Sequence, residues 1–555
     1  MVSAPNRLAT DGLPRPGDPH GRTAPPAFDG EIEVLPGQVV RLGRTSWRKQ
    51  APRPTEAQRQ ALRPGARKAG STGLAPYVPS DDAPWDRKRA LHLIRRLAFG
   101  AHTDEIEILL SYSPEDAVDT LIDIAAGLPA LRAPSWANEA PPHWTEPDHV
   151  RQRYVDDTLD WVNEYEWEVY GQFVSQGISW PFGRMAHGFR EKLALFWHDH
   201  FVTSWEVYFL APWLHRYWSL LREHAFGDFR TFVHEIGLDG SMLMYLNGVD
   251  NRWWAPNENY ARELLELFTM GILDDDGNPN YTETDVQELS RVLTGWGVDY
   301  YGTMRPVFVP DWHDTGEKTV LGQTGTWRYN DVVPLLFSAR GDQIATFICR
   351  KLYRAFVYAE PDETVVAEMA ALLKASDWEI APVLKALFKS EHFFSDAIIG
   401  AMIKSPVEHT FGMHRTMQRP YDRDNQGFLW WVTWLAGQVI FDPPTVAGWP
   451  GYRDWVDTST ISMRWLVSEW LIDGDAPLFE FITSLDSADD AEALVADLAE
   501  LLLGLPPEPN VLDQGLDILL NGIPAYEWDH RAPGAIWRID ALVAFLGRLP
   551  EHQLT

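Results

Sequence analysis

Residues 256–296, PNENYARELLELFTMGILDDDGNPNYTETDVQELSRVLTGW, decide the fold because they predict two helices joined by a short acidic turn. Asn257 precedes the first helix, where its side-chain oxygen can accept a free backbone N–H of the first turn. Gly271 stands where a residue in the left-handed conformation would end that helix. Thr282 begins the second helix, and Asp285, three residues later, completes a capping box. The stretch therefore predicts a helical hairpin within a mostly helical chain.

The first of these helices has an acidic stripe. Asn259, Glu263 and Glu266 are spaced i, i+4 and i+7, so they share one helix face. Two carboxylates beside an apolar face are costly unless a cation, an arginine or a shared proton offsets their charge. In the alternative interpretation both carboxylates face water, and Glu258 and Arg262 form a surface ion pair. The neighbouring stripe is apolar and contains Tyr260, Leu264, Leu267 and Phe268.

The same stretch carries a family resemblance. NENYARELLELFTMG (257–271) followed by YTETDVQELSRVLTGW (281–296) resembles the signature of the DUF1800 family, a bacterial family of unknown function. The resemblance spans about residues 85–470, and it implies no particular reaction. Members are often exported and often encoded beside a DUF1501 protein, so the resemblance offers a DUF1501-type protein as a partner. The other segments that agree with the family pattern are RALHLIRRLAFGA (89–101), EKLALFWHDHFVTS (191–204), LREHAFGDFRTFVHEIGLDGSMLMYLNG (221–248), WHDTGEKTVLG (312–322), KLYRAF (351–356), KSPVEH (404–409) and FDPPTVAGWPGYRDW (441–455).

Composition excludes several classes of function. The 555 residues carry a formal net charge of −31, which argues against binding nucleic acid or anionic membranes. The one cysteine, Cys349, rules out a disulfide framework and CxxC metal sites, and its apolar context predicts a core position. No run of 18 apolar residues occurs, so we expect no membrane span. The first residues have no apolar signal segment, so the sequence as written predicts a cytoplasmic protein, unlike the exported members of the family.

The chain divides into three predicted parts. Residues 1–85 form an irregular, basic, Pro/Gly-rich extension, with 12 Lys and Arg against 6 Asp and Glu in residues 1–70. Within this extension a short strand pair is expected around EIEVLPGQVVRLG (31–43). Residues 86–475 form a large, mostly α-helical body, and residues 476–555 add two or three closing helices. The fold class is therefore mostly α, as a single multi-helical body with one small β-hairpin excursion.

The strongest metal-ligand candidates are His198 and His200, which flank Asp199 in the segment FWHDHF. Two histidines at i and i+2 point to opposite sides of a helix but to the same side of an extended segment. Both can therefore bind one ion only if the helix has ended or distorts there. Otherwise one histidine is a ligand and the other supports it or has a structural role. A single histidine on an apolar helix is usually a core residue with its hydrogen bonds satisfied. Imidazole combined with carboxylate favours Zn, Mn or Fe over Ca.

A second His/carboxylate pair, His313 and Asp314, is predicted at the tip of a hairpin. The sequence VFVPDWHDTGEKTVLG (307–322) alternates in VFV, turns at Asp314-Thr315-Gly316 and resumes in TVL. Such a hairpin could cover a site formed by the helices. The alternative is that Asp314 only caps the turn through its own side chain.

Two later segments carry further expectations. Lys404 and Glu408 are spaced i, i+4, and their default interpretation is a surface ion pair. Residues 441–455, with three prolines and two glycines, predict a rigid loop that could wall a pocket, including Trp449. The 26 tryptophans fit either gap filling between helices or an aromatic recognition surface, and Trp253-Trp254 is one such cluster.

These observations favour a metal-dependent enzyme, with hydrolysis slightly ahead of oxidation because the Glu-x-x-His spacing of di-iron proteins is missing. The expected divalent ion is Zn, Mn or Fe. The alternative is a non-catalytic helical scaffold whose polar motifs are buried ion-pair networks and which binds a partner such as a DUF1501 protein. A structural Ca²⁺ at residues 274–280 is a third option, although the loop does not match an EF-hand. For the enzyme, the catalytic candidates are Glu263, Glu266 and Asp285, the ligand candidates are His198, His200, Glu263, Glu266, His313 and Asp314, and the substrate-binding candidates are Asn259, Trp296 and Trp449.

Overall fold

A computed structural model describes residues 31–35, 38–41, 72–175, 177–471 and 476–555. The chain consists of two units, residues 1–68 and residues 69–555. In the first unit, β1 (Glu31–Leu35) and β2 (Gln38–Arg41) pair in antiparallel fashion, with Glu31 opposite Arg41. The expected strand pair is therefore present, and the rest of the expected extension up to residue 71 lies outside the described residues.

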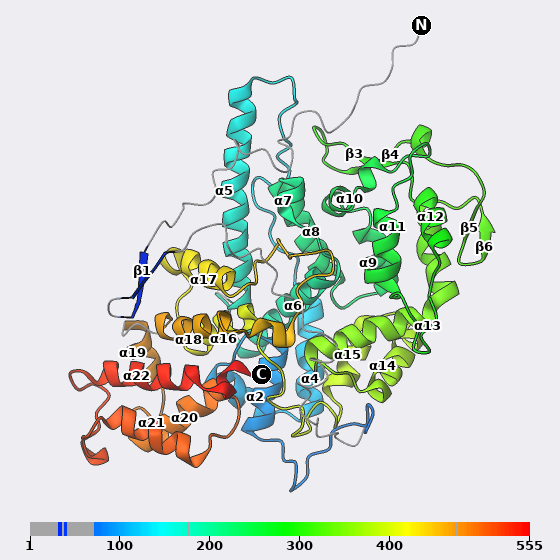
Figure 1. Ribbon diagram of the computed structural model, residues 1–555. Coiled ribbons are helices and arrows are strands. Elements are labelled where there is room, and N and C mark those ends of the chain that lie inside the picture. Colours follow the sequence, from blue (N-terminus) through cyan, green and yellow to red (C-terminus); the bar gives the residue numbers. More distant parts are fainter. Residues whose placement is uncertain (1–30, 36–37, 42–71, 176, 472–475) are drawn as a thin grey trace. The chain divides into compact units, whose positions relative to one another are not determined.

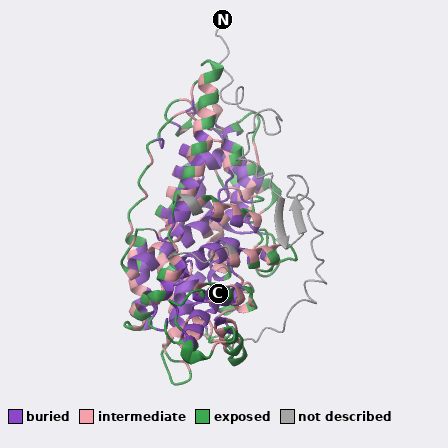
Figure 2. Ribbon diagram, turned by 90° about the vertical axis from the view of Figure 1, so that its left-hand side faces the viewer, coloured by how far each residue is buried: buried purple, intermediate pink, exposed green. Residues whose placement is uncertain are grey.

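The second unit is mostly helical, as the sequence predicts, and its first half is organised around helix α6 (Pro181–His200) (Figure 1). Helix α6 is buried along almost its whole length. Figure 2 shows buried residues throughout the interior of the helical unit. The helices that pack against it are α2 (Arg87–Leu97), α3 (Thr103–Leu110), α4 (Pro114–Gly127), α5 (Asp148–Phe173) and α8 (Ala211–His224).

The chain then forms a group of short helices beside α8. Asp228 and Asp239 cap α9 and α10 by accepting the N–H groups of Arg230 and Ser241. The short helices are α7 (Trp205–Tyr208), α9 (Phe229–Ile236), α10 (Gly240–Tyr245) and the 3₁₀ turn η1 (Gly248–Asp250).

The predicted helical hairpin is present in residues 256–296, with one change. Asn257 accepts the N–H of Asn259 (3.0 Å), Gly271 ends the first helix at φ 74°, and Thr282 and Asp285 form the capping box. However, the first helix is α-helical only in α11 (Asn259–Glu263) and continues as the π-helical turn η2 (Leu264–Thr269). The second helix is α12 (Glu283–Val292).

The prediction of one hairpin over 307–322 is wrong. The segment VFV instead pairs with the chain before it, as β4 (Pro306–Phe308) against β3 (Trp296–Val298). The segment TVL pairs with the chain after it, as β5 (Lys318–Val320) against β6 (Gln323–Gly325). The β5–β6 turn, Leu321-Gly322, has φ 47° and 80°, and positive φ at both positions is the geometry of a tight two-residue hairpin turn. The 3₁₀ turn η3 (Pro310–Trp312) separates the two hairpins.

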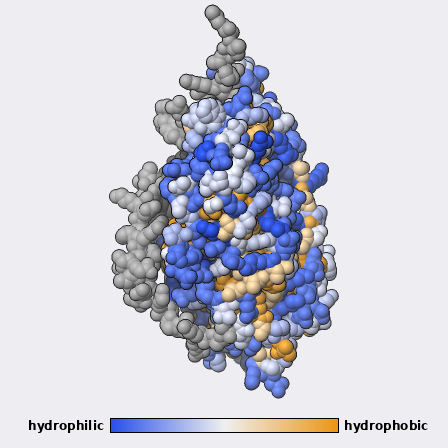
Figure 3. Space-filling view, turned by 90° about the vertical axis from the view of Figure 1, so that its right-hand side faces the viewer, coloured by the Kyte–Doolittle hydropathy of each residue, from blue (hydrophilic) through white to orange (hydrophobic). Residues whose placement is uncertain are grey.

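The long helix α13 (Tyr329–Phe356) follows, and it is kinked at Arg340, where φ is −137°. Its length and composition alone would allow a membrane span, although 44% of the apolar window is buried inside the protein. Cys349 is buried on this helix, as expected. Helices α14 (Glu363–Ala375) and α15 (Ile380–Phe388) pack in sequence after it. Figure 3 shows a mostly hydrophilic face on this side of the molecule, with an apolar band across its lower half.

Helices α16 (Pro406–Thr416), α17 (Arg423–Leu435) and α18 (Thr460–Trp470) precede the C-terminal group. That group consists of α19 (Ala476–Thr483), α20 (Ala491–Leu503), α21 (Pro509–Leu520), α22 (Ala535–Arg548) and the 3₁₀ turn η6 (Pro550–Gln553), so it is larger than the two or three helices expected. Helix α22 packs on α18, which joins this group to the rest of the core.

Helix α20 in the C-terminal group begins with an N-cap at Asp490. Asp490 accepts the N–H groups of Glu492 (3.0 Å) and Ala493 (3.1 Å) at the start of α20. We expect Asp490→Ala to lower the free energy of unfolding by about 1 kcal/mol, since two helix-end donors lose their acceptor. Urea denaturation measures the change. Asp513→Ala, at an exposed position inside α21, is the control, and an equal loss in both variants would contradict the cap assignment.

Candidate functional site

The centre of the predicted site is the end of α6, where His198 is a fully bonded core residue. Its Nε2 accepts the backbone N–H of Phe441 (3.0 Å). Its Nδ1 lies 2.7 Å from the hydroxyl of Tyr217, which donates its own proton to the carbonyl of Phe201 (2.7 Å). Nδ1–H is therefore the donor to Tyr217. Burial lowers the pKa of His198 to about 3, so the ring is neutral, and neither nitrogen is available to an ion in this arrangement.

Asp199 holds the Pro/Gly-rich loop that was expected to wall a pocket. Its Oδ1 accepts the backbone N–H of Trp449 at 2.7 Å. Gly448 allows this approach, because a Cβ atom there would lie 2.1 Å from the same oxygen and its φ is 82°. Burial raises the pKa of Asp199 to about 6, against the opposing effects of the Trp449 N–H and of Lys351. The Trp449 ring packs edge-on against His198, with centroids 5.5 Å apart.

His200 points to a third element, the π-helical turn η2. Its Nε2 donates to the carbonyl of Phe268 (3.1 Å), and its Nδ1 accepts from Lys351 Nζ (3.0 Å). Lys351 also donates to the carbonyl of Leu267 (3.2 Å). Burial lowers the pKa of Lys351 to about 8, with Asp199 acting in the opposite direction. Both nitrogens of His200 are therefore engaged, and a buried lysine stands where the prediction had an ion.

The same contacts explain why η2 is π-helical. In this turn the N–H of Met270 reaches back five residues to the carbonyl of Leu265 (3.1 Å), and the Thr269 hydroxyl donates to the carbonyl of Leu264 (2.5 Å). The wider turn leaves the carbonyls of Leu267 and Phe268 to Lys351 and His200. π-Helical turns inside helices are frequent at functional sites, and this turn carries Glu266 and directly follows Glu263.

Glu263 and Glu266 are the least satisfied of the predicted site residues. Glu266 accepts the hydroxyl proton of Tyr281 (2.9 Å). Glu263 is half-buried and has no hydrogen-bond partner among the described residues, and burial followed by the Glu266 charge raises its pKa. Arg262 forms its ion pairs with Glu258 and Glu283, and its charge only partly offsets the raised pKa of Glu263. The expected surface pair of Glu258 and Arg262 is thus present, and neither Glu263 nor Glu266 has a direct ion-pair partner among the described residues.

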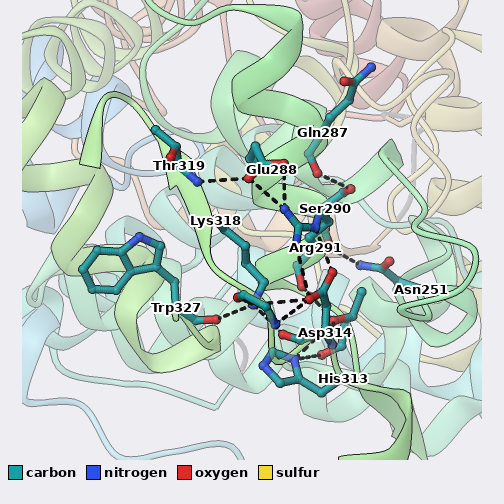
Figure 4. A network of polar contacts seen from close by, with 12 residues as sticks. Asn251, Gln287, Glu288, Ser290, Arg291, His313, Asp314, Lys318, Thr319 and Trp327 are labelled. Carbon is teal, nitrogen blue, oxygen red and sulfur yellow. Dashed lines mark hydrogen bonds and ion pairs between the residues drawn. The ribbon is translucent and has the colours of Figure 1, made fainter. Parts of the chain in front are cut away.

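The second predicted pair, His313 and Asp314, lies in a polar network centred on Arg291 (Figure 4). Arg291 binds both Glu288 (2.8 Å) and Asp314 (2.8 Å). Asp314 also accepts the N–H of Gly316 (2.8 Å), so it does cap the turn, and the Arg291 pairing with this cap holds its pKa below the usual value although burial opposes the shift. His313 Nδ1 donates to the carbonyl of Thr294 (3.0 Å).

The remaining candidates also have structural contacts. Asp285 accepts the N–H of Leu321 (2.7 Å) in addition to capping α12. Asn259 donates to the side chain of Asn247 (3.3 Å). Trp296 packs between Phe308 and Tyr329, at centroid distances of 5.4 and 5.6 Å. Each of these residues therefore fixes local backbone or core packing.

The predicted ion site is not assembled. Among the described residues, no group of three donors close enough to share one ion includes His198, His200, Glu263, Glu266, His313 or Asp314. The residues therefore do not fit an ion held by two histidines and a carboxylate. A group with that spacing occurs instead at Asp489, Asp529 and His530, where Arg531 already binds Asp489 (3.3 Å).

In the alternative of buried ion-pair networks, Lys351 is a predicted partner of Glu263 or Glu266, but it binds His200 and the carbonyl of Leu267 instead. Sequence reasoning missed two further side chains: Tyr217 and Asp442, which accepts the Ser204 hydroxyl at 2.6 Å. No local pattern marks Tyr217, whose partners lie on another helix.

The family model of DUF1800, described as a protein of unknown function, matches residues 92–554. The chain belongs to the DUF1800 family. The match extends beyond residue 470, so the closing helices α19–α22 are part of the DUF1800 region. No curated protein and no solved structure matches the chain.

The neutral state of His198 predicts a pH dependence for this DUF1800 member. Its folded pKa, about 3, lies below the usual 6.5, so between these values the unfolded chain binds a proton that the folded chain does not. Stability linked to His198 is thus lost as the pH falls from 6.5 toward 3. We expect His198→Gln to lower stability at pH 7 and to make the acid dependence shallower by up to about one proton.

Urea unfolding at several pH values between 4 and 7 measures both effects. His143→Gln, at an exposed histidine, is the control. An unchanged slope in His198→Gln would contradict a buried neutral His198.

Proposed function

We propose that this DUF1800 member is a non-catalytic helical scaffold that binds a partner protein. The observation that carries the proposal is that all four ring nitrogens of His198 and His200 are bonded within the protein. An ion bound through either ring would have to displace a buried hydrogen bond, and an unsatisfied buried group costs about 1–3 kcal/mol. The segment 198–200 therefore serves the fold, which favours a scaffold over an enzyme with a two-histidine ion.

A surface for the partner is available at the tryptophan pair before α11. Trp253 and Trp254 are 54% and 56% exposed, and their rings meet edge to face at 5.5 Å. Their position is rigid, because Trp253 donates its indole N–H to the carbonyl of Asp311 (3.1 Å) and Arg252 stacks on Trp312 (3.6 Å). Rigid exposed aromatic residues beside an arginine are the typical anchors of protein interfaces. The partner that the family resemblance offers is a DUF1501-type protein.

The tryptophan pair is the part of the proposal that a binding assay can test. We expect Trp253→Ala/Trp254→Ala to weaken binding of a DUF1501-type protein by at least about tenfold, since truncated aromatic anchors commonly cost 2 kcal/mol or more. Calorimetry on the purified proteins measures the dissociation constant.

Trp537→Ala is the matched control, because Trp537 is 63% exposed on α22. Equal affinities in the wild type and the double variant would rule out this surface. An absence of any binding by the wild type would count against the DUF1501-type partner.

A second candidate function, metal-dependent hydrolysis, rests on the unneutralised pair Glu263 and Glu266. A divalent cation would supply the charge that Arg262 does not, and one carboxylate could serve as general base toward a bound water. Oxygen donors alone favour Mn over Zn or Fe, and non-haem iron chemistry would need the two histidines that are engaged elsewhere. In this second candidate function, the ion would therefore be bound by carboxylates and not by histidine.

Metal content separates the two candidates. For the scaffold, we expect far less than one Mn, Zn or Fe per chain after dialysis against each metal, with no difference between the wild type and Glu263→Gln/Glu266→Gln. We also expect that double variant to melt at a slightly higher temperature, because it removes repulsion between two half-buried like charges. Elemental analysis and thermal melting measure these quantities. One ion per chain that is lost in the variant would favour the hydrolase instead.

A further inference from the structure

A group of buried cations lies far along the chain from the acidic motif, where α2, α6, α16 and α18 meet the C-terminal turn η6. Five side chains belong to it: Arg95, Arg96, Lys192, Lys404 and Arg464, each no more than 7% exposed. Within the described residues, Glu408 is the one carboxylate that acts on all five. It forms a direct ion pair only with Lys192, at 2.6 Å.

This arrangement corrects the expectation of a surface pair between Lys404 and Glu408. Lys404 is buried and donates to the carbonyl of His552 (2.6 Å), and Glu408 binds Lys192. Arg95 donates to the carbonyl of Leu554 (2.8 Å), and Arg464 donates to the carbonyl of Lys404 (2.7 Å). The cations thus hold the end of the chain on the core, mostly through neutral carbonyls that do not cancel their charge.

Loss of protons cannot remove the excess charge. Burial lowers the pKa of Lys404 well below its usual value, and it lowers that of Arg95 to about 10 and that of Arg96 to about 9. Arginine nevertheless stays protonated in proteins. Even with both lysines neutral, three arginines face one carboxylate. Several donors in this group also lack a partner, namely Nε and Nη1 of Arg96 and Nε of Arg464.

A small cavity is lined by two of these five cations, Arg95 and Lys404, whereas Arg96, Lys192 and Arg464 lie outside its lining. It has a volume of about 20 Å³, and its lining includes Arg95 and Lys404 together with Glu408, His552 and Thr555. A single water needs roughly 10–15 Å³ by this measure, so the cavity holds one occupant of atomic size. A phosphate or sulfate, with four oxygens around a central atom, is too large. Thr555 pairs through its backbone with Met402, and no ion pair within the described part of the chain joins it to the cations.

We propose that this cavity binds one halide ion, of which chloride is the common member, between α2, α16, α20 and η6. Size restricts the occupant to a single atom or a water, and the uncancelled charge of Arg95, Lys404 and their neighbours favours an anion over a water. Because Arg95 and Lys404 both donate to carbonyls of residues 552–554, the ion stabilises the docking of the C-terminal turn on the core. The inference is independent of the scaffold proposal and concerns a different part of the fold.

Bromide tests the site directly, because it is a chloride analogue with a usable anomalous signal. Crystals of the full chain grown in sodium bromide should show an anomalous peak in the cavity, within contact distance of Arg95 and Lys404. A cavity that contains only a water, with bromide absent or confined to the protein surface, would overturn the proposal.

Thermal melting gives a second measurement in solution. At constant ionic strength, we expect the wild type to melt several degrees higher in sodium chloride or bromide than in sodium gluconate. Lys404→Met should lose most of that difference, whereas Lys374→Met, at a solvent-exposed lysine, should keep it. Equal melting temperatures of the wild type in all three salts would contradict halide binding. If Lys404→Met does not fold, the bromide peak in the wild type still decides the question.

Discussion

The structure depends on hydrogen bonds from the side chains at the end of α6 to backbone N–H and carbonyl groups in the irregular segments around it. Successive residues of an α-helix point about 100° apart, so three in a row reach three different neighbours. At the end of α6, His198 reaches the N–H of Phe441, Asp199 reaches the N–H of Trp449, and His200 reaches the carbonyl of Phe268. Buried backbone groups outside regular structure need such partners. These three side chains supply them for the 441–455 loop and for the π-helical turn.

This divergence also explains why the two histidines do not share an ion. The helix continues through His200 instead of ending before it, so the i, i+2 pair points to opposite sides. An ion shared by both histidines would require an early end or a distortion of α6. Neither occurs. The distortion is found instead in the segment that contacts the end of α6, the π-helical turn η2. This turn supplies the carbonyls of Phe268 and Leu267 to His200 and Lys351.

What could be predicted from the sequence was local. The capping box of Thr282 and Asp285 and the left-handed Gly271 depend on residues within one turn, and the mostly helical character follows from apolar spacing. The π-helical turn could not be predicted, because its causes, His200 and Lys351, lie more than 60 residues away on either side. The hairpin error has a similar origin. Strands of three residues carry little sequence pattern. The turn at Leu321-Gly322 pairs the segment TVL with β6, which follows it, instead of with VFV.

Amino-acid composition likewise does not predict where in the molecule the charged residues lie. A net charge of −31 describes the protein as a whole, yet the cations around Glu408 are buried together. Spacing alone made Lys404 and Glu408 a surface pair, since i, i+4 says which residues share a face and not which way that face points. Only the contacts of the two side chains reveal that the face is internal: Lys404 donates to the carbonyl of His552, and Glu408 pairs with Lys192 on α6.

The polar residues predicted for the site differ in how completely their hydrogen-bonding groups are satisfied. Both ring nitrogens of His198 and of His200 are bonded, and Arg291 pairs with Glu288 and Asp314. A satisfied polar network specifies one arrangement of the chain. Glu263 departs from this rule, because it is half-buried, carries a raised pKa and lies beside another carboxylate. A group left in that state is either tolerated through partial solvation or reserved for a ligand. Among the predicted site residues that the structure describes, Glu263 and Glu266 are therefore the two whose charge is least compensated.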